Sequence, residues 1–224
     1  MPSDEFIVLA CSLKKTGRCV AGISTRTKQW VRPVSTYDEG QLGPYQYLID
    51  GREPKLLDIV ECEHQGPTGD PAQPENVLVG DEPLRLAGRV DPDEAYERLT
   101  PHLAEGPELF GNIGASVPEA EAEAGVACSL ALIEPQELSF ELREPWGGRS
   151  RASPRAHFEL DGCAYDIGLT DRIVRPRLFK AGYGIYSPAD LDIKAGEHTL
   201  LTASLGGAFK QAHWKLAAAV VFLP

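Results

Sequence analysis

The sequence predicts a mainly β fold made of two tandem small β-barrels, with a short helix and irregular inserts. Each half offers four or five short strand-like runs, and a five-stranded Greek-key barrel fits that number. These runs do not alternate with helical periods, so a parallel sheet built from strand–helix units is not expected. We expect one barrel in residues 1–125, with an acidic insert that contains the helix, and a second barrel in residues 126–224.

The first predicted strands lie between Phe6 and Ser35. Phe6–Ser12 is a nearly continuous apolar run, which predicts a strand buried on both faces. Gly17 suits the turn into a returning strand at Cys19–Ser24. A third strand, Trp30–Ser35, contains Pro33, which has no N–H to donate to a sheet and so should end it.

The rest of the first half mixes one strand, one loop and one helix. Lys55–Cys62 reads as a strand, and the five Gly and Pro residues of 65–76 predict a loop. Asp91–Leu103 predicts a short amphipathic helix, because Asp91 can cap it, Pro92 suits its first position, and apolar residues recur every four positions. Gly111–Ala127, rich in small residues and Glu, is interpreted as the linker between the halves.

The second half is again rich in strands. Ser129–Glu141 is expected to be one strand, and Ala156–Leu169 predicts a hairpin that turns at Asp161-Gly162. Arg172–Lys194 shows no regular period, with a brief helical turn near Ser187–Pro188. Two strands, Leu200–Leu205 and Trp214–Phe222, close the chain.

The charge of the chain is uneven. Its net charge is −11 over 224 residues, yet residues 58–125 alone hold 16 acids against 3 arginines, and the remainder is slightly basic. Five irregularly spaced cysteines favour a reducing compartment. The acidic start lacks the pattern of a signal peptide, and no apolar run approaches the ~20 residues of a membrane helix. We therefore expect a cytoplasmic protein that does not use a membrane.

Several motifs together resemble one protein family. They are CSLKKTGRCVAGIS, WVRPVS, DGREPKLLDIVE, QPEN, TASLGGAF and WKLAAAVVF, in this order from Phe6 to Phe222. In them the chain resembles the bacterial dual OB-fold (dual OB-containing) domain family. The resemblance implies two OB-like barrels and, by association, nucleic-acid binding or processing. It implies no established catalytic residue.

A basic and aromatic cluster near the N-terminus is the first candidate site. Cations spaced along a groove contact phosphates, and an aromatic face beside them stacks on bases. Two readings of the cluster stay open: it binds nucleic acid, or its cations solvate turns while Trp30 anchors the core. Arg32 shares a strand face with Trp30. If that face is interior, Arg32 requires a carboxylate partner, because burying an unpaired guanidinium is costly; if it is exterior, Trp30 faces solvent as in a binding surface. The cluster comprises Lys14, Lys15, Arg18, Arg26, Lys28 and Arg32 with Trp30 beside them, and the residues expected to contact the ligand are Lys14, Lys15, Arg18, Trp30 and Arg32.

Further candidates are spread along the chain. The amides of Gln73 and Asn76 either read base edges or fix a local turn. Trp146 and Arg151 lie in a Gly- and Arg-rich stretch that suits stacking, although a solvated hairpin tip has the same composition. Lys215 follows Trp214 in the last strand. The expected ligand of these residues is single-stranded DNA or RNA.

Other functions are weaker readings of the same sequence. One is a protein-interaction scaffold in which the acidic region 58–125 docks a basic partner. Another is a metal-dependent nuclease using Asp166 or Asp171, although five residues apart on a strand these face opposite sides. Cys62 and His64 lack the paired spacing of a zinc site. We therefore favour an accessory protein that binds or processes nucleic acid over an enzyme, and we expect no cofactor and no metal.

Overall fold

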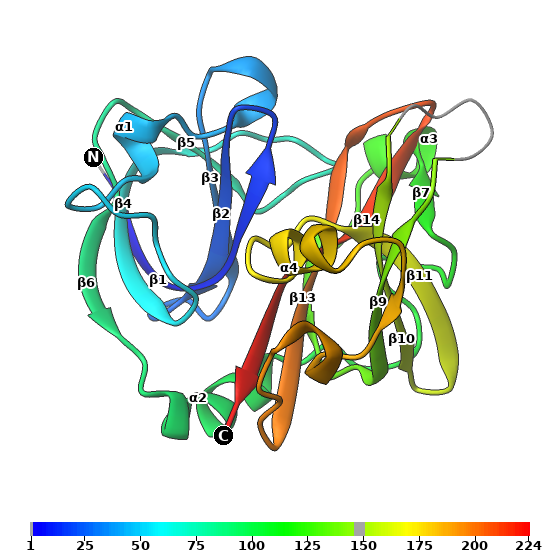
Figure 1. Cartoon of the computed structure of the whole chain (residues 1–224). Coiled ribbons are helices and arrows are strands. Elements are labelled where there is room, and N and C mark those ends of the chain that lie inside the picture. The colour runs from blue at the N-terminus through cyan, green and yellow to red at the C-terminus, as the bar shows by residue number, and fades with distance from the viewer. Residues whose placement is uncertain (1, 146–150) are drawn as a thin grey trace. The chain divides into compact units, whose positions relative to one another are not determined.

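The computed structural model describes residues 2–145 and 151–224 and divides the chain into two compact units. The first unit comprises Met1–His102 and Glu121–Leu130, and the second comprises Leu103–Ala120 and Ala131–Pro224. The chain is mainly β, as the sequence predicts, and each unit is built on its own sheet (Figure 1). Within the described residues, no helix is long and apolar enough to span a membrane.

The sheet of the first unit closes on itself. Its strands follow the order β1-β2-β3-β5-β4, and β1 also pairs with β4, which completes a ring. The β3–β5 pair is parallel and the other pairs are antiparallel. The strands are β1 (Ser3–Lys14), β2 (Gly17–Ser24), β3 (Trp30–Val34), β4 (Asp58–Pro67) and β5 (Asn76–Val79), with β6 (Arg85–Arg89) added beside β4.

The long strand β1 organises this barrel. It is buried from Phe6 to Cys11, in agreement with the apolar run, and an irregularity between Val8 and Ala10 bends it. Its neighbour Gly22 has no room for a side chain, since a Cβ there would lie 1.9 Å from the carbonyl oxygen of Ile7. The sequence therefore lets two strands approach more closely at this point than any other residue would allow.

The helices of the first unit are short: α1 (Pro44–Tyr47), α2 (Pro92–Leu99) and the 3-10 turns η1 (Asp38–Gly40) and η2 (Thr100–His102). In α2 the carboxylate of Asp91 accepts a hydrogen bond from the backbone N–H of Asp93, and Ala95 and Leu99 are buried. The helix ends at Leu99 and not at Leu103. The predicted loop 65–76 is shorter than expected, because β4 runs on to Pro67 and β5 begins at Asn76.

The second unit repeats the strand order of the first. Its path β9-β10-β11-β14-β13 corresponds to β1-β2-β3-β5-β4, and β11–β14 is again a parallel pair. The additional strands β12, β8 and β7 pair with β9, β13 and β14. The strands are β7 (Ser116–Pro118), β8 (Leu130–Ile133), β9 (Gln136–Arg143), β10 (Ser153–Leu160), β11 (Cys163–Leu169), β12 (Gly184–Tyr186), β13 (His198–Ala208) and β14 (Ala212–Leu223).

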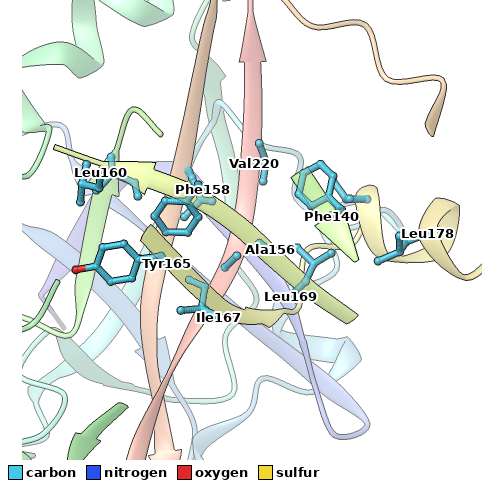
Figure 2. Close-up of a cluster of buried hydrophobic side chains, with 14 of the residues drawn as sticks. Phe140, Ala156, Phe158, Leu160, Tyr165, Ile167, Leu169, Leu178 and Val220 are labelled. Carbon is cyan, nitrogen blue, oxygen red and sulfur yellow. The ribbon is translucent and has the colours of Figure 1, made fainter. Parts of the chain in front are cut away.

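The predicted hairpin at Asp161-Gly162 is confirmed, since both residues have the positive φ, 47° and 78°, that such turns require. The core behind it includes the stacked rings of Phe158 and Tyr165, whose centroids lie 5.2 Å apart. Leu178, from α4 (Val174–Ala181), lies beside Phe140 of β9 in this core (Figure 2).

Three expectations for the second half need correction. Ser129–Glu141 holds two strands, β8 and β9, with Pro135 between them. The expected linker Gly111–Ala127 contains β7 and the helix α3 (Glu119–Glu123), because β14 offers β7 a free strand edge. The expected irregular segment Arg172–Lys194 contains α4, β12 and the 3-10 turn η3 (Ala189–Leu191). Burial of Val174 and Leu178 supports α4 although its sequence has no clear helical period.

Candidate nucleic-acid interface

Two cations of the predicted N-terminal cluster, Lys15 and Arg18, are engaged by carboxylates. Lys15 lies 2.9 Å from Glu39, and Arg18 lies 2.6 Å from Glu53 with its guanidinium 5.3 Å above the ring of Tyr47. Lys14 is half-buried at the end of β1. A phosphate approaching Lys15 or Arg18 would have to displace an existing ion pair.

Arg32 belongs to a buried network. It is 2% exposed, and its Nη2 donates to the carbonyl oxygen and the hydroxyl of Ser129, at 3.2 and 3.0 Å. The Ser129 hydroxyl donates in turn to the Glu75 carboxylate at 2.7 Å. Ser129 therefore links the buried Arg32 guanidinium to the Glu75 carboxylate.

The QPEN tetrad supplies the rest of this network. Asn76 receives a long hydrogen bond of 3.5 Å from Arg32 and donates to the Gln73 side chain at 3.1 Å. Glu75 also accepts from the backbone N–H groups of Ser129 and Leu130. Since Gln73 and Asn76 are 8% and 6% exposed, these amides do not face solvent. Glu75 and Arg32 hold residues 129 and 130 beside β3 and β5.

The remaining predicted residues have separate environments. Trp30 is half-buried, and Arg151 is exposed. Trp146 lies outside the described residues. Lys215 is 1% exposed. Its ammonium donates to the backbone and side-chain oxygens of Asn112, at 2.6 and 2.9 Å, and lies 5.4 Å from the ring centre of Tyr165. Burial lowers the pKa of Lys215 to about 8.

The carboxylates considered for nuclease chemistry are committed to structure. Asp166 contacts Arg155 at 2.6 Å and Arg143 at 3.2 Å. Asp171 is 2% exposed and accepts from the backbone N–H groups of Ile173, Val174 and Val220, which fixes the start of α4. In the part of the chain that the structure describes, no three His, Cys, Asp or Glu residues gather as a metal site would require.

One exposed surface was not anticipated from the sequence, and α4 and β12 form it. Val174 and Leu178 of α4 point into the core, whereas Arg175 and Phe179 face outward four residues apart. The Arg175 guanidinium lies 5.0 Å above the Phe179 ring. Tyr186 of β12 ties the two elements together, because its hydroxyl donates to the carbonyl oxygens of Ala181 and Tyr183.

Large apolar side chains are exposed along this segment. The exposed fractions are 52% for Ile173, 43% for Phe179, 54% for Tyr183 and 68% for Ile185. Solvent-facing aromatic and aliphatic groups gathered in one place mark binding surfaces. We call Ile173, Arg175, Phe179, Lys180, Tyr183 and Ile185 the α4–β12 surface.

The charge of this segment is entirely positive. From Arg172 to Pro188 there are four basic residues and no acidic one. Arg177 donates to the carbonyl oxygens of Leu191 and Asp192. Arg175 and the exposed Lys180 form no ion pair with any described residue. The acid-free run RIVRPRLFKAGYGIY is the sequence signal that could have identified the site.

The fold agrees with the comparison to known families. The model of the dual OB-containing domain matches residues 4–220, nearly the whole chain. The chain therefore belongs to the dual OB-containing domain family, and its two units are the OB-like barrels that the family description implies. Among curated proteins, no sequence matches it.

Proposed function

We propose that this protein binds single-stranded nucleic acid, DNA or RNA, through the α4–β12 surface of its second unit. The observation that carries the proposal is the Arg175 guanidinium stacked 5.0 Å above the exposed Phe179 ring, within a basic run that contains no acid. Membership of an OB-fold family supports the ligand class.

The chemistry of the surface suits a single strand. Bases present π-faces that stack on Phe179 and Tyr183, and each such stack is worth about 1–3 kcal/mol. Arg175 and Lys180 are available to phosphates, since carboxylates of described residues do not occupy them. A duplex hides its base faces, so it offers such a surface only its phosphates.

The acidity of the chain is concentrated in the first unit, whereas this surface belongs to the second. The first unit holds nineteen acidic and eleven basic residues, a net of −8, whereas the second holds fourteen and eleven, a net of −3. The second unit is therefore the better electrostatic partner for a polyanion.

Fluorescence anisotropy with labelled single-stranded DNA and RNA oligonucleotides tests the proposal. We expect binding that weakens steeply with salt, and a loss of about 5- to 100-fold in affinity for Phe179→Ala. Arg175→Ala should weaken binding and reduce the slope of log K against log salt by about 0.7, the contribution of one phosphate contact.

Arg98→Ala is the matched control. Like Arg175, Arg98 is an arginine on a short helix, but it is exposed and lies in the acidic part of the first unit. Its substitution should leave the affinity unchanged. Unaltered binding by Phe179→Ala and Arg175→Ala, or equal losses in all three variants, would contradict the proposed site.

A second candidate is docking of a basic protein through the acidic region 58–125. The observation that favours it is the exposed row Asp91, Asp93, Glu94 and Glu97 at α2. Absence of oligonucleotide binding even at low salt, with salt-sensitive capture of a polylysine peptide that is lost when these four acids are neutralised, would favour this function instead.

A further inference from the structure

Two exposed tyrosines of the first unit lie together near η1 and α1. Tyr37 is 56% exposed and Tyr45 is 47% exposed, and their rings meet edge to face with centroids 6.3 Å apart. The Tyr45 side chain is also hydrogen-bonded to that of Tyr37, which is the main reason why the pKa of Tyr45 is raised to about 12. The two rings therefore hold each other in one arrangement while both remain open to solvent.

The local backbone fixes the positions of both tyrosines. Gly43 leaves room for the Tyr45 ring, since a Cβ there would lie 2.8 Å from Cε1 of that ring. The carbonyl oxygen of Tyr37 accepts a hydrogen bond from the N–H of Gly40 at 2.6 Å, which closes a tight turn. Because the backbone is held on both sides, the pair loses little conformational freedom when a ligand binds.

An acidic segment lies beside Tyr45. The side chain of Gln46 donates to the carbonyl oxygen of Gly80 at 2.8 Å, and the backbone carbonyl oxygen of Gln46 accepts from the N–H of Leu84 at 2.8 Å. These bonds hold the segment between β5 and β6 against α1. Within this segment Asp81 is exposed, and its negative charge is close enough to act on the Tyr45 hydroxyl.

The same helix shows what a tyrosine and a carboxylate bind together. The Arg18 guanidinium lies 5.3 Å above the ring of Tyr47, and its Nη2 lies 2.6 Å from a carboxylate oxygen of Glu53. An arginine fits such a pair because its flat guanidinium stacks on the ring and also pairs with the carboxylate. Tyr45, two residues earlier in α1, offers the same combination with Asp81 on the exposed side. Within the part of the chain that the structure describes, no basic side chain pairs with Asp81 or lies over Tyr45.

We propose that Tyr37, Tyr45 and Asp81 form a docking surface for an arginine-containing segment of a protein partner. The guanidinium of that segment stacks on the Tyr45 ring and pairs with the Asp81 carboxylate. The surrounding charge suits such a partner, because residues 35–57 hold four acids and two bases. The proposal does not depend on nucleic-acid binding, since all three residues belong to the first unit and the α4–β12 surface belongs to the second.

Fluorescence anisotropy with a labelled tetra-arginine peptide tests this surface, and a tetra-lysine peptide of equal charge serves for comparison. Wild-type protein should bind the arginine peptide more tightly, because an ammonium does not stack on a ring or pair with a carboxylate as a guanidinium does. Tyr45→Leu, which removes the ring, should weaken binding of the arginine peptide by about 2- to 5-fold, as expected for one exposed cation–π contact. Tyr45→Phe, which keeps the ring, should bind it as the wild type does.

The contribution of the carboxylate is tested separately. Asp81→Asn should weaken binding of the arginine peptide by up to about 5-fold at low salt, and by less at high salt. Glu121→Gln is the matched control, because it removes the same charge from another exposed residue of the first unit, and it should leave the affinity unchanged. Equal losses in the two variants would show that net charge alone attracts the peptide, and would overturn the proposed surface.

The outcomes for peptide and nucleic acid are distinguishable. Tyr45→Leu should bind single-stranded oligonucleotides with wild-type affinity, and Phe179→Ala should bind the arginine peptide with wild-type affinity. Unaltered peptide binding by Tyr45→Leu, equal binding of the arginine and lysine peptides, or no peptide binding at all would overturn the docking surface and leave the proposed function standing. Peptide binding that is lost only when the acids at α2 are neutralised would overturn it as well.

Discussion

Lys215 should make the stability of the second unit depend on pH in the alkaline range. Its ammonium is buried against Asn112 and Tyr165, and burial lowers its pKa from 10.5 to about 8, although Glu108 acts in the opposite direction. The unfolded chain therefore binds more protons than the folded chain between pH 8 and pH 10.5. Consequently this residue makes the free energy of unfolding increase as pH rises through that window.

The size of the effect follows from the pKa difference. Each pKa unit corresponds to about 1.4 kcal/mol, so the charged ammonium costs the folded state up to about 3 kcal/mol below pH 8. Lys215→Met removes this titration while retaining a side chain of similar length. Loss of the hydrogen bonds to Asn112 shifts the stability of the variant by an amount that does not vary with pH.

Urea unfolding at pH 7, 8, 9 and 10 measures the difference between the two proteins. A Trp30→Phe background leaves tryptophan fluorescence to report the second unit, since Trp30 is the one tryptophan of the first. The buried Tyr165, whose pKa burial raises, titrates in both proteins and largely cancels in the comparison. Parallel curves of unfolding free energy against pH would refute the reasoning.

Three further substitutions test the buried polar groups. Glu75→Gln should destabilise the first unit by about 1–3 kcal/mol in urea unfolding, because an amide nitrogen cannot accept the hydrogen bonds that Ser129 and Leu130 donate. The control is Glu121→Gln, a substitution of an exposed glutamate in the same unit. Equal effects of the two substitutions would contradict this prediction. Asp58→Asn should cost about 2 kcal/mol at pH 7, since Asp58 is 2% exposed and pairs with Arg52 and Arg89. Burial alone would raise the pKa of Asp58, but hydrogen bonds from Arg52, Lys55 and Arg89 outweigh it and lower the pKa below 3.8. Its stabilisation should therefore fade as pH falls through the acid range, and identical acid profiles of wild type and Asp58→Asn would exclude it. Asp171→Asn should reduce the free energy of unfolding of the second unit by about 1–3 kcal/mol and so lower its melting temperature, because three backbone N–H groups donate to that carboxylate. An unchanged melting temperature would contradict this.

The strands with strong local signals could be predicted, whereas the short strands β5, β6, β7 and β12 could not. The apolar run of β1 and the Asp161-Gly162 turn each specify structure within a few residues. The helix α4 could not be predicted in this way. Pro176 interrupts its sequence, and only Val174 and Leu178 are buried, so packing in the core determines it.

The sequence did not reveal which candidate site residues are buried, for a related reason. Lys215 points inward while its neighbour Trp214 is exposed, and Arg32 is buried while Trp30 is only half-buried. In both pairs the cation is more buried than the tryptophan, although Lys and Arg are usually exposed and Trp is usually buried. The partners that make them possible, Ser129 and Asn112, lie about a hundred residues away in the sequence, where no local pattern reveals them.

The connection between the third and fourth barrel strands differs in charge between the two units, and this difference supports placing the nucleic-acid site on the second unit. The connection between β3 and β4 exposes Tyr37 and Tyr45, whose rings meet edge to face at 6.3 Å. The corresponding connection between β11 and β13 exposes Phe179 and Tyr183.

Residues 35–57, the first connection, hold four acids and two bases, and residues 170–197, the second, hold four acids and five bases. Within the second connection, Arg172–Pro188 has four of those bases and no acid. Both connections therefore offer aromatic side chains to solvent, but only the second has a net positive charge, with its bases gathered in the segment that carries Phe179 and Tyr183. Exchange of the two charge patterns, with the aromatic residues left in place, should transfer oligonucleotide binding to the first unit if charge decides between the barrels. Binding that stays with the second unit would show that the geometry of α4 and β12, and not their charge, selects the ligand.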